Sequence, residues 1–321
     1  MSEPSDFVAR LRAEQQAPGR DAALRLDRGT RRRRALIAAA AAALVLVGAG
    51  VWVASSTGGR PADEPYAPAA LDEAMWPPEW PATVRMPFRG SPSAAWADGA
   101  AGIELPASEA AGGLTSVQVG EALRATRALL VESNLNPRHA LGAHPDAALT
   151  RLDPRDGTRA GLEKALQSPG DGVGPLWLFT RFDPSEVRLH GDVIKTRGTM
   201  TYEASPTGEL LVHADYTFVY PLVKTSGGVE IVPGAEEVTR TVVRRRLDLV
   251  ANNEGQLTVR GAYWRAANDD CRTPDDGYLH PLFTEERSTA PKWPAIDPYN
   301  GEFQLVAKDA PDRQCATPKQ T

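Results

Sequence analysis

The stretch LLVHADYTFVY, residues 210–220, decides the fold, because apolar and polar side chains alternate along it. Successive residues of a β-strand point to opposite faces of the sheet. One face of this strand therefore collects Leu210, Val212, Ala214, Tyr216, Phe218 and Tyr220. The other face collects Leu211, His213, Asp215 and Thr217. This alternation predicts an antiparallel sheet with one covered face.

The stretch belongs to one of four long strand-like runs, over 187–204, 209–223, 238–251 and 256–267. Turn-forming sequences separate the runs, at 205–208, 227–228 and 252–255. These runs are longer than the usual strand of roughly five to six residues, so they have to twist and bend. Kinks or bulges are expected at Gly191, Gly198 and Gly261.

A helical pattern precedes the strands. Thr115 and Gln118 have capping-box spacing at the start of a helix predicted over 115–134, and shorter helices are predicted from Pro145 and over 158–167. Helices followed by a strand meander predict an α+β domain. We expect N-terminal helices packed in a curved, cone-like antiparallel sheet of four to five strands, plus one transmembrane helix.

The transmembrane helix is predicted at residues 35–54, which carry no charge and follow Arg31, Arg32, Arg33 and Arg34 directly. A helix of that length spans about 30 Å, the thickness of the hydrocarbon core of a bilayer. Since basic residues stay on the cytoplasmic side, the N-terminus is predicted in the cytoplasm and the C-terminal part outside. The long basic leader and the lack of an Ala-x-Ala site favour an uncleaved signal anchor over a cleaved signal peptide.

Composition then divides the chain into five parts. These are a basic cytoplasmic segment (1–34), the span (35–54), an extracytoplasmic tether rich in Pro, Ala and Gly with a possible small hairpin (55–109), the α+β core (110–268) and a C-terminal extension (269–321). Both cysteines, Cys271 and Cys315, follow the span, where the compartment is oxidising, so a disulfide is predicted to clamp the extension. A reactive thiol pair is the alternative, but the C-x-x-C spacing is absent.

Charge and motifs exclude several classes of function. The 321-residue chain has a net charge of −5, with +4 in residues 1–34 and −9 in the remainder, which argues against a nucleic-acid partner. G-x-S-x-G, S-x-x-K, H-E-x-x-H and Walker sequences are absent from the chain. The five histidines are scattered, and no cysteine lies near the closest pair, His139 and His144, so we expect neither a metal site nor a cofactor.

Two groups of side chains remain as candidates. His213 and Asp215 share a strand face and have the chemistry of an acid–base pair, although the same face is the solvent side of the sheet. Three arginines share one face of the next run and have the chemistry of an anion-binding stripe, the alternative being a solvated face balanced by acids. They are Arg240, Arg244 and Arg246, while Arg245 falls on the opposite face.

The order of elements, the helix over 115–134 and a meander ending at Gly261-Ala262-Tyr263-Trp264 resemble the nuclear transport factor 2-like (cystatin-like, ketosteroid-isomerase-like) fold. The resemblance covers residues 110–268 and extends to the extracytoplasmic domains found behind a single span in many actinobacterial membrane proteins. It implies isomerases, dehydratases or members that only bind or assemble. Enzymes of this fold usually place Asp, His or Tyr in the mouth of the cone, and the candidates here are His213, Asp215 and Tyr202.

We therefore expect a plasma-membrane protein without catalytic activity, acting as an extracytoplasmic binding or assembly module of the cell envelope. Its partners would be the lipid bilayer and an envelope protein, or a second copy of itself. One alternative is an isomerase or dehydratase with a pocket on the same fold. The other is a transmembrane sensor whose residues 1–34 dock a cytoplasmic partner.

Overall fold

A computed structural model of the protein describes residues 81–170, 174–225, 236–252, 254–270, 272–273, 275–291, 294–300, 305–307 and 317–318. The predicted cytoplasmic segment, the predicted span at 35–54 and both cysteines lie outside these residues. Within them, no helix has the length and apolar character needed to cross a bilayer. All of the described residues belong to one compact unit, which runs from Asp72 to Thr321.

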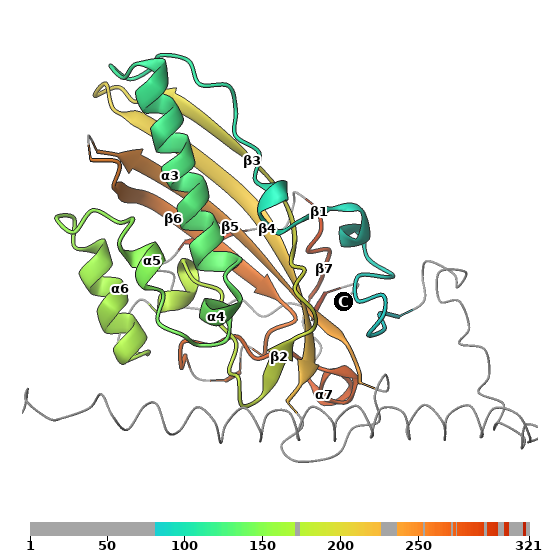
Figure 1. Ribbon diagram of the computed structural model, residues 1–321. Coiled ribbons are helices and arrows are strands. Elements are labelled where there is room, and N and C mark those ends of the chain that lie inside the picture. Colours follow the sequence, from blue (N-terminus) through green and yellow to red (C-terminus); the bar gives the residue numbers. More distant parts are fainter. Residues whose placement is uncertain are drawn as a thin grey trace, which may run out of the picture. The chain divides into compact units, whose positions relative to one another are not determined.

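The unit is an α+β fold built on a mainly antiparallel sheet, as the alternating sequence predicts (Figure 1). Its centre is a meander of four long strands, β3 (Lys195–Ala204), β4 (Leu210–Lys224), β5 (Thr239–Ala251) and β6 (Leu257–Ala267). Short strands pair with its edges: β1 (Ala97–Asp98) with β3, β2 (Val187–Leu189) with β4, and β8 (Val306–Ala307) with β6. A separate parallel pair joins β7 (Ala295–Ile296) to β9 (Thr317–Pro318).

The expected kinks occur at two of the glycines. The run predicted over 187–204 is two strands, β2 and β3, because residues 191–194 leave the edge of β4, and Gly191 there has a φ of +71°. A β-bulge interrupts the β5–β6 pairing between Asp248 and Leu249, opposite Gly261. Both irregularities bend long strands that would otherwise continue flat.

The long helix begins where its capping box predicts. In α3 (Ser116–Asn134) the Gln118 amide nitrogen donates to Thr115 Oγ1, and the Gln118 side chain accepts from the Thr115 nitrogen at 3.0 Å. Three shorter helices follow, α4 (Pro137–Ala140), α5 (Asp146–Leu149) and α6 (Thr158–Gln167). Three 3₁₀ turns, η2 (Pro92–Ala95), η3 (Gly99–Gly102) and η4 (Pro175–Trp177), and the helix α7 (Thr284–Thr289) complete the elements.

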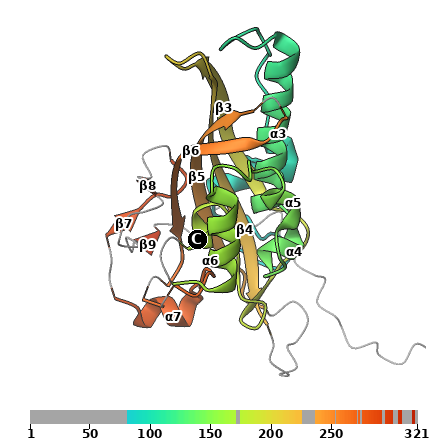
Figure 2. The same cartoon turned by 90° about the vertical axis from the view of Figure 1, so that its left-hand side faces the viewer.

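The helix α3 contacts β4 and β5 on one side of the sheet, which we call the inner face. Figure 2 shows α3 on that side and the separate pair of β7 and β9 on the other. The predicted apolar set of β4 points to the inner face, where each of its side chains is at most 1% exposed, and it packs against Leu123, Leu129 and Leu130 of α3. These side chains form one buried apolar cluster with the helix.

The prediction of a single covered face holds only for the first half of β4. From Val219 to Val223 every side chain is buried. The reason is a second apolar cluster on the opposite, outer face, to which segments distant in sequence contribute. Its members are Phe88, Trp96, Val219, Val242, Ala267 and Tyr299.

The segment 81–109, expected to form a tether with a possible hairpin, is instead part of the folded unit. The residues 97–98 pair with β3, as Ala97↔Thr196 and Asp98↔Lys195. Lys195 Nζ adds an ion pair to Asp98 at 2.6 Å. The strand β1 also precedes the helices, so the folded part does not begin with helices as the sequence suggested.

A buried guanidinium joins the helices to the inner face of the sheet. Arg245 on β5 is 0% exposed. Its Nε donates to Asn134 Oδ1 at 2.6 Å, Nη1 to the Leu176 carbonyl at 2.5 Å, and Nη2 to Thr180 Oγ1 at 3.1 Å. The Tyr220 hydroxyl donates to the Asn134 carbonyl at 2.8 Å. Since these partners are neutral, burial lowers the pKa of Arg245 to about 9.

We predict that Arg245→Ala lowers the free energy of unfolding by about 3 kcal/mol or more, because it opens a cavity and leaves buried acceptors without a donor. Chemical denaturation of the full chain in detergent measures this loss. The matched control is Arg246→Ala, whose side chain is 49% exposed on the other face, and a change within about 0.5 kcal/mol is expected. Equal effects of the two substitutions would contradict a structural role for the Arg245 network.

Candidate functional site

The candidate site is the upper part of the outer face, where polar side chains of adjacent strands meet. Residues directly opposite each other in an antiparallel pair point to the same side. The pairings His213↔Asp248, Asp215↔Arg246 and Arg246↔Tyr263 therefore bring these side chains together. The predicted placement of His213 and Asp215 on one face is thus observed.

His213 pairs with a carboxylate that sequence reasoning did not find. Its Nδ1 lies 2.7 Å from Asp248 Oδ1, and its Nε2 lies 3.4 Å from Glu203 Oε1. A Cβ on Gly261, the β6 residue opposite Asp248, would lie only 2.6 Å from Asp248 Oδ2. The absent side chain therefore gives the Asp248 carboxylate its place beside His213.

Asp215, the expected partner of His213, is bound elsewhere. Arg244 donates to it from two nitrogens, Nε to Oδ1 at 2.9 Å and Nη2 to Oδ2 at 2.7 Å. This bidentate pair raises the pKa of Arg244 above its ordinary value, mainly through the hydrogen bond to Asp215. Asp215 is accordingly held as an ion-pair partner on this face.

Tyr202 lies on the other side of the sheet from His213. It is paired with Val212, one of the inward-facing residues of β4. Its hydroxyl donates to the Ala107 carbonyl at 2.9 Å and accepts from the Glu109 nitrogen at 2.8 Å. The three candidates His213, Asp215 and Tyr202 therefore do not converge on one site.

The predicted arginine stripe is divided into three different environments. Arg240 is buried, and its Nη1 donates to the carbonyls of Pro87 at 3.0 Å and Arg89 at 2.7 Å. Burial lowers the pKa of Arg240. Arg244 is paired with Asp215, as described above. Arg246 alone of the three is largely exposed, with its guanidinium 5.0 Å from the Tyr263 ring and 3.8 Å from Asp248.

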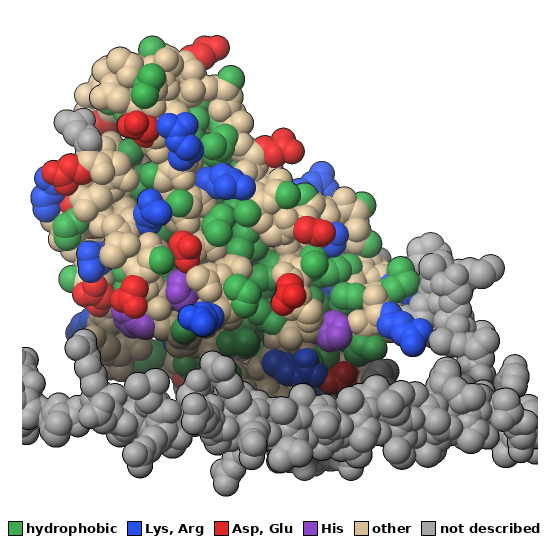
Figure 3. All heavy atoms as spheres, in the orientation of Figure 1, with side chains coloured by type: hydrophobic (Ala, Val, Ile, Leu, Met, Phe, Trp, Pro, Cys, Tyr) green, Lys and Arg blue, Asp and Glu red, His purple; other side chains and the backbone are tan. Residues whose placement is uncertain are grey.

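This part of the outer face is thus a polar surface with mixed charge. Its side chains are fixed by cross-strand pairs, and His213, Arg246 and Tyr263 remain partly open to solvent. On the helix-covered side, basic and acidic side chains are also interspersed (Figure 3). Among the described residues, no group of three or more His, Cys, Asp or Glu side chains has the arrangement of a metal site.

Comparison of the chain with protein-family models, with curated proteins and with solved structures found no match. The functional argument therefore depends on the residues themselves. The contacts of Asp248 and Glu203 with His213 could not be predicted from the sequence, because the register between strands decides which residues lie side by side. The one available signal was the alternation that places Asp248 on the same strand face as Arg244 and Arg246.

We predict a measurable coupling between Asp215 and Arg244. In a double-mutant cycle with Asp215→Ala and Arg244→Ala, we expect a coupling energy of about 1 kcal/mol, because the pair is bidentate and only 31% and 16% exposed. The matched control is Glu209 with Arg260, which are 44% and 54% exposed, where about 0.3 kcal/mol is expected. A coupling for Asp215 and Arg244 no larger than the control would show that they do not fix this surface.

Proposed function

We propose that the chain is a membrane-anchored binding or assembly module of the cell envelope, without catalytic activity, that contacts its partner through the outer face of the sheet. The uncharged stretch at 35–54 and the four arginines before it support a single span with the N-terminus in the cytoplasm. The folded unit then lies outside the cytoplasmic membrane. Its partner is an envelope protein or a second copy of the chain.

The contrast between the two sides of the sheet carries this proposal. Inner-face side chains such as Phe218 and Tyr220 are 0% exposed and packed against helices. The outer face presents His213 and Arg246 beside Asp248, and Tyr263 beside Arg246. Charged groups that are already oriented by neighbours favour specific recognition, because little side-chain freedom is lost on binding.

The chain order of elements supports the nuclear transport factor 2-like resemblance as part of the proposal. The helices α3 to α6 precede the strands β2 to β6, and α3 contacts β4 and β5. A cone-like sheet around that helix, an actinobacterial source and a Cys271–Cys315 disulfide belong to the same proposal. Binding members of that fold need no catalytic group in the mouth of the cone.

One observation favours an enzyme as the second candidate. The Nδ1 of His213 is hydrogen-bonded to Asp248 at 2.7 Å, which is the arrangement that orients a histidine as a general base. An isomerase or dehydratase would then use Nε2, which lies 3.4 Å from Glu203. His213→Ala would abolish the activity of such an enzyme by removing its base, whereas a binding module has no turnover to change.

We predict that the C-terminal part of the chain lies outside the cytoplasmic membrane. A periplasm-active phosphatase fused after residue 321 should be active, and the same fusion should lose most activity when Arg31, Arg32, Arg33 and Arg34 are replaced by Glu, because these charges set the orientation. Equal amounts of both fusions have to be shown by immunoblot. An inactive fusion of the natural sequence would contradict the extracytoplasmic placement.

We also predict that the partner contacts the outer face of the sheet. A photo-crosslinking amino acid at Thr199, which is exposed and pairs with Asp215 on the outer face, should give a discrete adduct with one envelope protein or a second copy in intact cells. Arg246→Glu should reduce that adduct about tenfold, a loss of ~1.4 kcal/mol.

The matched controls lie on α3. A photo-crosslinker at Val117, which is 66% exposed, should give no such adduct, and Arg124→Glu should leave the Thr199 adduct unchanged. The contact surface would lie elsewhere if only the crosslinker at Val117 gave an adduct, or if Arg246→Glu left the Thr199 adduct unchanged.

A further inference from the structure

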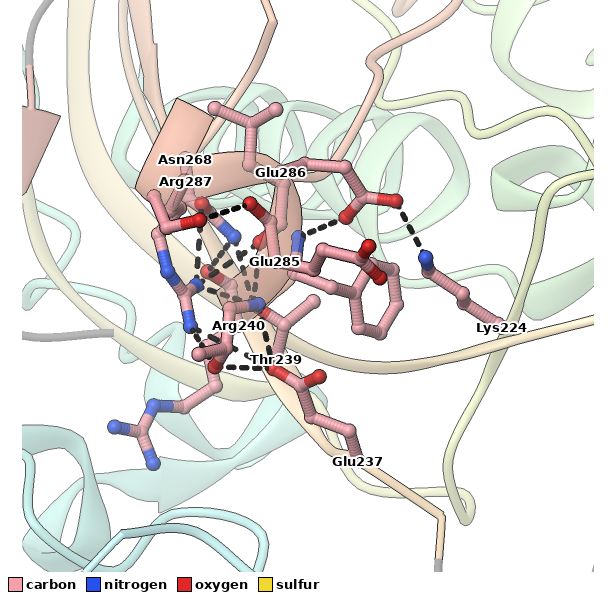
Figure 4. Close-up of polar contacts among 12 residues, drawn as sticks. Lys224, Glu237, Thr239, Arg240, Asn268, Glu285, Glu286 and Arg287 are labelled. Atoms are coloured by element: carbon pink, nitrogen blue, oxygen red, sulfur yellow. Dashed lines mark hydrogen bonds and ion pairs between the residues drawn. The ribbon is translucent and has the colours of Figure 1, made fainter. Parts of the chain in front are cut away.

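The segment after β6 crosses the end of the sheet and is fixed there by α7. We call residues 268–291 the C-terminal strap. Figure 4 shows Arg287 of α7 directed at Thr239 and Asn268. Arg287 Nη1 donates to Thr239 Oγ1 at 3.0 Å and to the Leu282 carbonyl at 2.9 Å. Asn268 Nδ2 donates to the same Thr239 oxygen at 2.9 Å. These contacts hold one end of the strap against β5.

A second attachment of the strap depends on His280. This side chain is 10% exposed. Its Nδ1 lies 2.9 Å from Glu186 Oε2, in the turn that leads into β2, and its Nε2 lies 3.2 Å from Asp276 Oδ1. The His280 amide nitrogen donates to Asp269 Oδ1 at 2.7 Å, and its carbonyl accepts from the Asp270 nitrogen at 2.7 Å.

Two carboxylates on one imidazole decide its protonation state. A neutral imidazole has one N–H donor and one lone pair, so one of its nitrogens would face a carboxylate oxygen without a proton between them. The imidazolium form donates from both nitrogens, and both hydrogen bonds are then charge-assisted. The geometry around His280 therefore fits the protonated form.

The surrounding charges act in the same direction. Asp183 precedes β2, and Asp270 follows β6. Hydrogen bonds from Ser185 are the main cause of the lowered pKa of Asp183, and those from Arg272 are the main cause for Asp270. The charge of the nearby His280 lowers both pKa values further. Of the neighbouring bases, Arg272 is bound to Asp270 at 2.6 Å.

Arg181, whose carbonyl accepts from the Leu279 nitrogen, has its guanidinium 5.0 Å from the Tyr278 ring. Burial alone lowers the pKa of His280, but the hydrogen bonds to Glu186 and Asp276 outweigh it, and the pKa is raised.

We propose that protonated His280 is a pH-dependent latch, which joins the strap to Glu186 before β2 and releases it when the proton is lost. The free-energy contribution of the latch is fully present below the ordinary histidine pKa of about 6.5. It is lost as the pH rises through the raised pKa of the folded state. The strap therefore loosens as the pH rises.

Release of the latch changes how much apolar surface is exposed to water. Next to His280, Leu279 forms a bridge with Phe182, and both side chains are 0% exposed. Release of this part of the strap exposes them to water. Because α7 has its own contacts with Thr239, the release is local and leaves the sheet folded.

Hydrogen exchange of the full chain in detergent between pH 6 and 9 tests the latch. After correction for intrinsic exchange, the opening constant at the amides of Asp270, Leu279 and His280 should rise severalfold, by at most about tenfold per pH unit. The amides of Val212 and Leu247 in the central strands should show no such rise.

His280→Gln should abolish the pH dependence, and Glu186→Gln should weaken it by removing one charged partner. The matched control, His213→Gln on the outer face, should leave it intact. If His280→Gln fails to fold, NMR titration of the natural chain decides, because a His280 pKa at or below 6.5 would overturn the proposal. A flat opening constant across the pH range, or pH dependence that survives in His280→Gln, would overturn it as well.

Discussion

The buried guanidinium of Arg245 constrains how the helical half of the molecule meets the sheet. Removing such a charge from water costs several kcal/mol, and among the described residues no carboxylate forms a hydrogen bond with Arg245 that would offset that cost. The compensation comes from Asn134 at the end of α3, from Leu176 in η4 and from Thr180. These groups lie far apart in sequence, so the three hydrogen bonds form only when the helix end, the 3₁₀ turn and β5 have reached their final positions.

This constraint also accounts for the difference between the two faces. On the inner face, Arg245 is hydrogen-bonded to side chains of the helical half, and the surrounding side chains are mainly apolar and buried. The outer face has an apolar half, where Trp96 and Tyr299 cover Val219, and a polar half, where His213, Asp248 and Arg246 stay accessible. A polar surface whose side chains are oriented by neighbouring charges suits recognition.

Local signals predicted the local structure. The alternation at 210–220 and the Thr115 capping box each depend on neighbouring residues, and the strand and the start of α3 follow them. The site depends on the register between β4 and β5. No two-residue turn joins these strands, so the sequence does not define which residues lie opposite each other. Sequence therefore paired His213 with the nearest acid, Asp215, instead of Asp248. The burial of Arg245 was equally hidden, because arginine is rarely an interior residue.

The two histidines bound by carboxylates show why burial decides which of them acts as a latch. His213 lies between Asp248 and Glu203, and His280 lies between Glu186 and Asp276. The His213 side chain is 33% exposed, whereas the His280 side chain is only 10% exposed. In this buried position the lone pair of neutral His280 would be left facing a carboxylate oxygen. Loss of the His280 proton therefore removes a connection between the strap and the sheet.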